Sequence, residues 1–163
     1  MRTLAFLAVV FLILPLLLLA AGQFGFLRGS PPGEPGLRDG KLQPPSRTRN
    51  SVSSQAHLWP AAEYDVEYAR IEPIRFAGDP VAAMNRLRDV LHSWPGATVV
   101  ENRPDYLAVE FETRWLRFVD DAEFLLDPAE RVIHVRSKSR LGRKDFGVNR
   151  SRIEALRRKL DLR

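Results

Sequence analysis

The stretch that decides the fold is FVDDAEF, residues 118–124. It reads as part of a β-strand, in which neighbouring side chains point to opposite faces of a sheet. By this alternation Asp120 shares a face with Phe118 and Phe124, while Asp121 points the other way. Because an isolated buried charge is costly, we expect the inward carboxylate of Asp120 to be matched by a cation or by several hydrogen-bond donors.

The patterns on either side of this stretch predict an α+β domain. Asp79 and Pro80 begin one helix, and Ser151 with Glu154 fits a capping box at the start of a last helix. In chain order the expected elements are an edge strand at 70–76, a helix at 80–94, strands at 97–102, 106–113, 115–126 and 131–139, and a helix from 149. This β-α-β-β-β-β-α order favours an antiparallel sheet of about five strands with two helices packed on one face.

A hairpin between the last two predicted strands brings hydroxyl groups to Asp120. Its turn allows two registers, which place either Ser137 or Ser139 opposite the aspartate. The loop that follows is rich in arginine, and we expect either Arg140 or Arg150 to fold back onto Asp120 as its cation.

Two interpretations of this region remain open at the level of sequence. In the first, a buried ion pair pins the loop to the sheet. In the second, Asp120 forms the floor of a polar pocket that binds a ligand. The predicted ligand-binding residues are Asp120, Ser137, Ser139, Arg140, Asp145, Asn149 and Arg150. No catalytic residue, metal ligand or cofactor is predicted.

The N-terminal segment is strongly apolar. Residues 4–21, LAFLAVVFLILPLLLLAA, carry no charge, and Arg2 precedes them. Their length lies at the lower limit of a bilayer-spanning helix, and a positive start followed by an apolar run is typical of a secretory signal. We expect residues 1–21 to be a signal-anchor or a signal peptide. The protein is then membrane-anchored on the exported, periplasmic face, or secreted if the segment is cleaved, although positive charges after the segment favour a cytoplasmic side.

The rest of the chain divides into a linker and one domain. Residues 22–62 are rich in Pro, Gly and Ser, which predicts a linker and an extended arm. The second half of this arm, with RNSVSSQA at 49–56, has enough specific character to pack on the domain. Residues 63–163 are expected to form a single α+β domain.

Composition and charge restrict the function classes. The chain has 163 residues and no cysteine, which excludes disulfides, thiol catalysis and Cys-ligated zinc. Its formal charge is +5, and residues 131–163 hold 12 Lys and Arg against 3 Asp and Glu. A basic C-terminal third favours an anionic partner such as membrane phospholipid, unless it pairs with the acidic first part. Nucleic acid is not expected, because most aromatic residues occupy core positions. The sequence does not specify an oligomeric state.

Three stretches together resemble a known family. RFVDDAEF at 117–124, VIHVRSKSRLGRKDFGVNRSRIEALR at 132–157 and RNSVSSQA at 49–56 are similar to the uncharacterised family named domain of unknown function (DUF) 1499. The resemblance covers about residues 37–160 and implies a signal or membrane segment, but no established activity. The family arm typically reads PNCVSSQ, and Ser51 stands here in place of its cysteine.

These observations favour an envelope protein that binds an anionic ligand or lipid and is not an enzyme. The alternative is a hydrolase-type enzyme that uses Asp120 and Asp145 in an arginine-lined pocket. A further conceivable nucleophile and base is Ser53 or Ser54 with His57, although no orienting acid is evident beside them.

Overall fold

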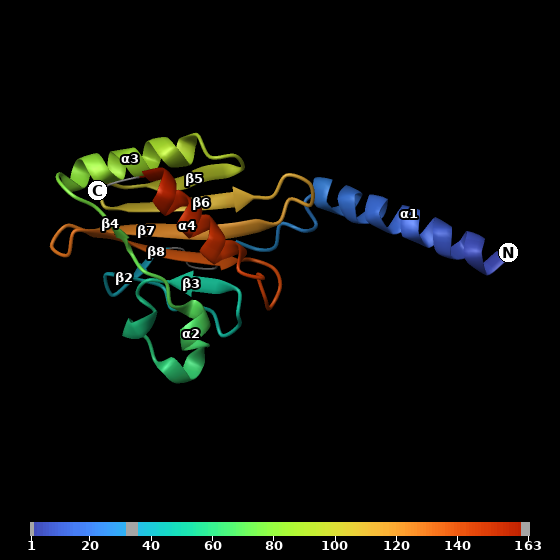
Figure 1. Ribbon diagram of the computed structural model, residues 1–163, viewed down its shortest axis with the longest axis horizontal. Helices are drawn as coiled ribbons and strands as arrows, with labels where there is room; N and C mark the ends of the chain where they lie inside the picture. Colours follow the sequence, from blue (N-terminus) through green and yellow to red (C-terminus); the bar gives the residue numbers. More distant parts are fainter. Residues whose placement is uncertain (1, 32–35, 161–163) are drawn as a thin grey trace.

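A twisted antiparallel sheet forms the centre of the protein (Figure 1). The computed structural model describes residues 2–31 and 36–160, with side chains from residue 10 onward. The strands of the sheet are β3 (Ser51–Ser53), β4 (Ile74–Arg75), β5 (Ala97–Asn102), β6 (Tyr106–Glu112), β7 (Val119–Asp127) and β8 (Val132–Ser139). Strands β5, β6, β7 and β8 are neighbours in that order, and the short β3 and β4 both pair with the remaining edge of β8. The predicted α+β class with an antiparallel sheet is confirmed, with six strands in place of about five.

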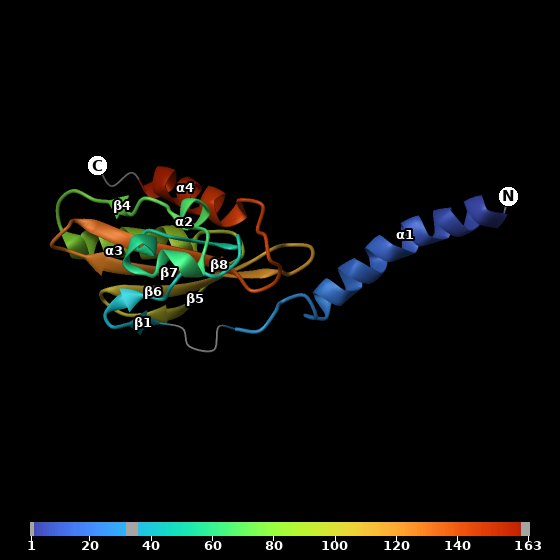
Figure 2. The ribbon, with the colours of Figure 1, turned by 90° about the horizontal axis from the view of Figure 1, so that it is seen from below.

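Two helices cover one face of this sheet, as predicted (Figure 2). They are α3 (Pro80–His92) and α4 (Val148–Leu160). Helix α3 starts where the sequence predicts, since the Asp79 carboxylate accepts a hydrogen bond of 2.8 Å from the Ala82 amide. The remaining elements are α1 (Arg2–Gln23), β1 (Leu37–Arg38), β2 (Lys41–Leu42), α2 (Val66–Ala69) and two 3₁₀ turns at Ala56–Leu58 and Ala61–Glu63.

The main core lies between the sheet and these two helices. Leu107, Phe124 and Ile133 point from three adjacent strands toward buried side chains such as Leu87 of α3 and Ile153 of α4. A smaller cluster lies on the other face, where Leu42 of β2 covers Tyr106, Ala108 and Leu125. Both faces of the central strands are therefore covered, one by helices and the other by the N-terminal arm.

Two strand predictions are wrong at their ends. Strand β7 begins at Val119 and not at 115, because the chain turns sharply before it: Arg117 has a φ of 55°, and the Phe118 amide donates 2.9 Å to Thr113 Oγ1. The predicted edge strand at 70–76 is a strand only at β4, directly after Pro73, which has no amide hydrogen for a sheet ladder, and Arg70 makes an isolated bridge to Ser53.

The predicted linker is partly a strand. Residues 51–53 form β3, which pairs with Arg136–Lys138 of β8, so the prediction of irregular structure over 22–62 is wrong there. The expectation that RNSVSSQA packs on the domain is confirmed. The predicted capping box at Ser151 is also wrong, because α4 begins at Val148 and the Asp145 carboxylate accepts from the Gly147 and Asn149 amides at 3.0 and 3.2 Å.

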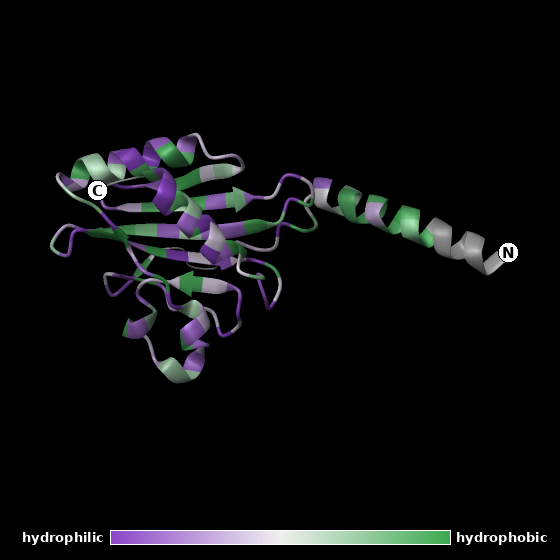
Figure 3. Cartoon of the chain, viewed as in Figure 1, coloured by the Kyte–Doolittle hydropathy of each residue, from purple (hydrophilic) through white to green (hydrophobic). Residues whose placement is uncertain are grey.

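Helix α1 extends away from the sheet, and most of its described residues are hydrophobic (Figure 3). Within the described residues, no helix is long and apolar enough to cross a membrane. The predicted signal-anchor at residues 1–21 lies in part outside the described residues, since side chains are described only from Val10.

The turn that joins α3 to β5 makes a first prediction. Gly96 and Gly78 both have positive φ, 75° and 78°, but a Cβ at Gly96 would lie 2.3 Å from the Glu112 carbonyl oxygen, whereas a Cβ at Gly78 meets no atom within 4 Å. We expect Gly78→Ala to cost about 1–2 kcal/mol of backbone strain. Gly96→Ala should cost about 1–3 kcal/mol more, because the β5–β6 edge must also move.

Urea denaturation of the full chain in mild detergent measures both variants. Equal midpoints for Gly96→Ala and Gly78→Ala would contradict the close approach of this turn to β6.

Candidate functional site

A buried amide at the start of α4 connects five of the seven predicted site residues into one polar network. Asn149 is 0 % exposed. Its Nδ2 donates 3.0 Å to Ser139 Oγ and 2.7 Å to Asp145 Oδ2. Its Oδ1 accepts 2.6 Å from Ser137 Oγ and 2.9 Å from an Arg152 amino group. All atoms of the Asn149 amide group are thereby engaged, which is how a buried polar side chain is stabilised.

Asp120 joins this network through Arg152. Its carboxylate forms a buried ion pair with the Arg152 guanidinium, which also lies 4.8 Å above the Phe111 ring. Asp120 points inward as predicted and opposes Ser139, one of the two predicted registers. The structure therefore confirms the prediction that a cation lies beside Asp120.

The prediction that this cation is Arg140 or Arg150 is wrong. Arg140 directly follows Ser139 at the end of β8, and its guanidinium pairs with acids of the face away from the helices, where Asp120 does not point. Arg150 donates 2.7 Å to the carbonyl oxygens of both Tyr68 and Arg70. Arg152 reaches Asp120 because it stands three residues after Asn149, on the same side of α4.

Arg140 neutralises carboxylates on the opposite face of the sheet. It donates 2.9 and 2.7 Å to the two oxygens of Asp121 and 2.5 Å to Glu110. The hydrogen bonds to Asp121 are the main reason that the pKa of Arg140 lies above its ordinary value. Arg28, from the segment after α1, pairs with Glu110 and Glu112 at 3.4 and 2.5 Å. This face thus carries a row of carboxylates that arginines neutralise.

A second buried pair continues this row. Arg136 donates 2.6 Å to Glu123, and the Tyr106 hydroxyl and the Gly36 amide donate 2.7 and 3.1 Å to the same carboxylate. Burial, followed by the hydrogen bond to Glu123, raises the pKa of Tyr106. These contacts fasten the N-terminal arm to the sheet.

The Asp145 carboxylate is hydrogen-bonded to groups of the α2 segment and of the α4 cap. Its carboxylate accepts from the Tyr68 hydroxyl, from the Gly147 and Asn149 amides and from the Asn149 side chain. Burial acts to raise the pKa of Asp145, but these hydrogen bonds outweigh it and hold the pKa below its usual range. A carboxylate stabilised in this way is a poor general acid.

Among the described residues, Ser54 contacts a histidine other than the conceivable base His57. His57 is exposed, whereas Ser54 is buried and its Oγ lies 3.3 Å from Nδ1 of His134. Ser53 Oγ accepts 3.2 Å from the Gln55 amide, which completes a local turn.

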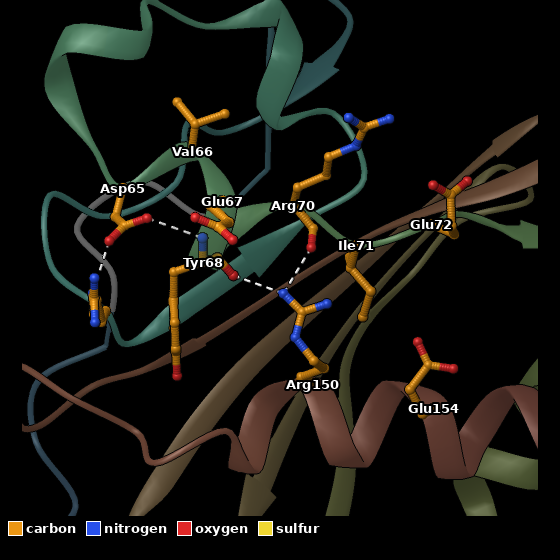
Figure 4. Close-up of a pocket in the computed structure, with 10 residues that line it drawn as sticks. Asp65, Val66, Glu67, Tyr68, Arg70, Ile71, Glu72, Arg150 and Glu154 are labelled. Atoms are coloured by element: carbon orange, nitrogen blue, oxygen red, sulfur yellow. Dashed lines mark hydrogen bonds and ion pairs between the residues drawn. The ribbon is translucent and has the colours of Figure 1, made fainter.

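A groove of about 930 Å³ lies between the α2 segment and α4 (Figure 4). Of the predicted site residues only Arg150 lines it, and its guanidinium points to the backbone of Tyr68 and Arg70. The lining includes three arginines, Arg49, Arg70 and Arg150, and four acids, Asp65, Glu67, Glu72 and Glu154. Because the two signs nearly balance, the groove does not concentrate anions.

A further surface surrounds the end of α1. We name residues 24–28, 113–118 and 140–147 the α1 rim; the two loops lie at the end of the sheet from which α1 extends (Figure 1). Gln23 Nε2 donates 2.9 Å to the Trp115 carbonyl, and Gly29 lies against Arg140 and Leu141. The rim exposes four aromatic side chains: Phe24 (79 %), Phe26 (78 %), Trp115 (63 %) and Phe146 (92 %).

The exposed charges of the α1 rim are all positive. They are Arg114, Arg143 and Lys144, while Asp145, the single carboxylate within these segments, is buried. Arg114 also lies 5.0 Å above the Trp115 ring. The rim thus combines exposed aromatic rings with exposed cations. The sequence carried this signal only as separate residues of three distant segments.

The family model described as protein of unknown function (DUF1499) matches residues 41–160, about three quarters of the chain. The chain belongs to the DUF1499 family. The DUF1499 match takes in β2 and β3, so the arm is part of the family domain, and the network around Asn149 is built from the motif that carried the resemblance. No curated protein and no solved structure shows a significant match.

The buried pair makes a second prediction. Asp120→Asn leaves the Arg152 charge uncompensated, and we expect the free energy of unfolding to fall by about 3–5 kcal/mol. Arg152→Met together with Asp120→Asn removes that charge and should recover a large part of the loss. Glu154→Gln, which breaks the partly exposed pair with Arg157, is the control and should cost less than about 1 kcal/mol.

Urea denaturation midpoints of the three variants measure these changes in the free energy of unfolding. A double variant no more stable than Asp120→Asn alone would contradict a cost that arises from the unpaired guanidinium.

Proposed function

We propose that this DUF1499 protein is a non-enzymatic envelope module. Its N-terminal segment anchors it in the membrane, its domain lies on the exported face, and its α1 rim contacts the headgroups of anionic lipids. If the segment is cleaved, the rim alone makes the contact and the protein is secreted. The observation that carries the proposal is the collection of four exposed aromatic side chains and only positive exposed charges around the end of α1.

The chemistry of the rim suits the lipid–water interface. Tryptophan concentrates at the headgroup level, and phenylalanine on a basic surface inserts below it. Each lysine or arginine near an anionic membrane adds about 1 kcal/mol of attraction. Exposed aromatic groups of this size in water are otherwise unfavourable, and such a patch marks an interaction surface.

The position of the rim supports the same proposal. An apolar helix that enters a bilayer brings its own end to the interface, and hydrogen bonds from Gln23 and Arg117 connect this end to the 113–118 loop. The loop at 140–147 is held in turn by Asn149 and Asp145 of the buried network. The aromatic residues are therefore presented by supported loops and not by loose termini.

The hydrolase alternative receives no support from these contacts. Asp120 is paired with Arg152, and Asp145 accepts four hydrogen bonds, so neither carboxylate is available for proton transfer.

A third prediction places Trp115 at the lipid surface. In liposomes that contain the full chain and lipids brominated in the upper acyl chain, tryptophan emission should be quenched, because bromine quenches an indole ring only at close range. Trp115→Phe should remove most of this quenching. Trp94→Phe, which changes a partly buried side chain packed against Phe111, is the matched control and should retain it. Quenching that survives Trp115→Phe would contradict the proposal.

A fourth prediction concerns lipid charge. Replacing part of the phosphatidylcholine by phosphatidylglycerol should increase the quenching, and added salt should reverse the increase. The double variant Arg143→Glu/Lys144→Glu should lose this dependence. Arg158→Glu, an exposed residue in the last turn of α4, should keep it. Equal quenching in both lipid mixtures would refute the preference for anionic headgroups.

A further inference from the structure

The β7–β8 hairpin, at the end of the sheet opposite α1, gathers three groups that can bind a metal (Figure 1). They are Asp127, Glu130 and His134, whose ligand atoms all lie within 4.8 Å of one another. Asp127 pairs with Val132, two residues from His134, so Asp127 and His134 are diagonal neighbours on one face of the hairpin. Glu130 comes from the turn between them.

The imidazole of His134 is fixed by the fold. His134 is 8 % exposed, and its Nδ1 lies 3.3 Å from Ser54 Oγ. Ser54 is itself held, because its Oγ accepts 2.9 Å from the Val135 amide and donates to the Val135 carbonyl at 3.4 Å. In the tautomer that matches this use of the hydroxyl hydrogen, Nδ1–H donates to Ser54 Oγ, and the lone pair of Nε2 is free for a metal. A hydrogen bond at one ring nitrogen that orients the other is the usual support of a metal-binding histidine.

Nε2 of His134 has no hydrogen-bond partner among the described residues. The nearest carboxylate oxygen, Asp127 Oδ2, lies 3.9 Å away, which is too long for a hydrogen bond. The other oxygen, Oδ1, accepts 2.9 Å from the Glu130 amide, and this contact fixes the carboxylate with Oδ2 toward the ring. The separation leaves room between Nε2 and Oδ2 for an ion bonded to both.

We propose that Asp127, Glu130 and His134 form a site for a divalent transition-metal cation. Its ligands are Nε2 of His134 and one oxygen of each carboxylate, and its fourth position is open to water. One imidazole and two carboxylates suit Zn²⁺ at bond lengths of about 2.0–2.2 Å, and Mg²⁺ much less well. The side chain of Glu130, on an exposed turn, closes the remaining distance. Because the site lies away from the α1 rim, it is independent of the lipid proposal.

Calorimetric titration of the chelator-treated, tag-free full chain with Zn²⁺ tests the site. We expect one Zn²⁺ per chain, a higher melting temperature when it is bound, and no comparable effect of Mg²⁺. His134→Gln should abolish the binding. Ser54→Ala removes the support of the imidazole and should weaken the binding by about 10–100-fold.

Two further variants keep the test independent of folding. Glu130→Gln alters an exposed turn residue and should leave the melting temperature without metal unchanged while weakening Zn²⁺ binding by at least about tenfold. Glu63→Gln, an exposed acid elsewhere, should bind as the wild type does. Absence of Zn²⁺ binding, or binding that survives both His134→Gln and Glu130→Gln, would overturn the proposal and assign any bound metal to exposed groups such as His57 and His92.

Discussion

The fold depends on the hydrogen bonds of one amide, the side chain of Asn149. It lies where α4 begins, and its donors and acceptors reach β8, the α4 cap and the arm at Asn50. The Asn50 side-chain amide donates in turn to the carbonyl oxygens of Ser139 and Gly142. The arm and the 140–147 loop are therefore both hydrogen-bonded to the Asn50–Asn149 pair. A buried network of this kind stabilises only when complete, since each unmatched group costs about 1–3 kcal/mol. This requirement gives a physical reason for the dense polar motif of this region.

The pairing of charges differs between the faces of the sheet and its two ends. Within the described residues, the buried carboxylates on both faces are matched, Asp120 by Arg152 on the helix side and Glu123 by Arg136 on the other. The aromatic and basic α1 rim lies at one end of the sheet, and Nε2 of His134, which has no hydrogen-bond partner among the described residues, lies at the other.

Short sequence patterns correctly predicted those features of the fold that depend only on neighbouring residues. The start of α3 follows from Asp79 and Pro80, and the inward direction of Asp120 follows from strand alternation; both are confirmed. Strand alternation places Arg140 on the face away from Asp120. The choice between Arg150 and Arg152 could not be predicted, because it depends on where α4 begins. The members of the α1 rim come from separate segments that only the folded chain brings together. The His134 cluster lies within one hairpin, but Asp127, Glu130 and His134 do not form a known metal-binding motif, so the sequence did not predict it. The arm strand β3 was hidden by a Pro- and Ser-rich composition that does not reveal pairing.

Asn149 couples the arm to the loop of the α1 rim, and hydrogen exchange with mass spectrometry measures this coupling. In the full chain carrying Asn149→Ala, we expect faster exchange in residues 46–53 and 140–147 together, with β5 and β6 protected as in the wild type. This pattern follows because the amides of Ser139 and Asp145 bond to the carbonyl oxygens of Asn50 and Arg49. Faster exchange confined to the first turn of α4, with the arm unchanged, would show that Asn149 does not couple the arm to this loop.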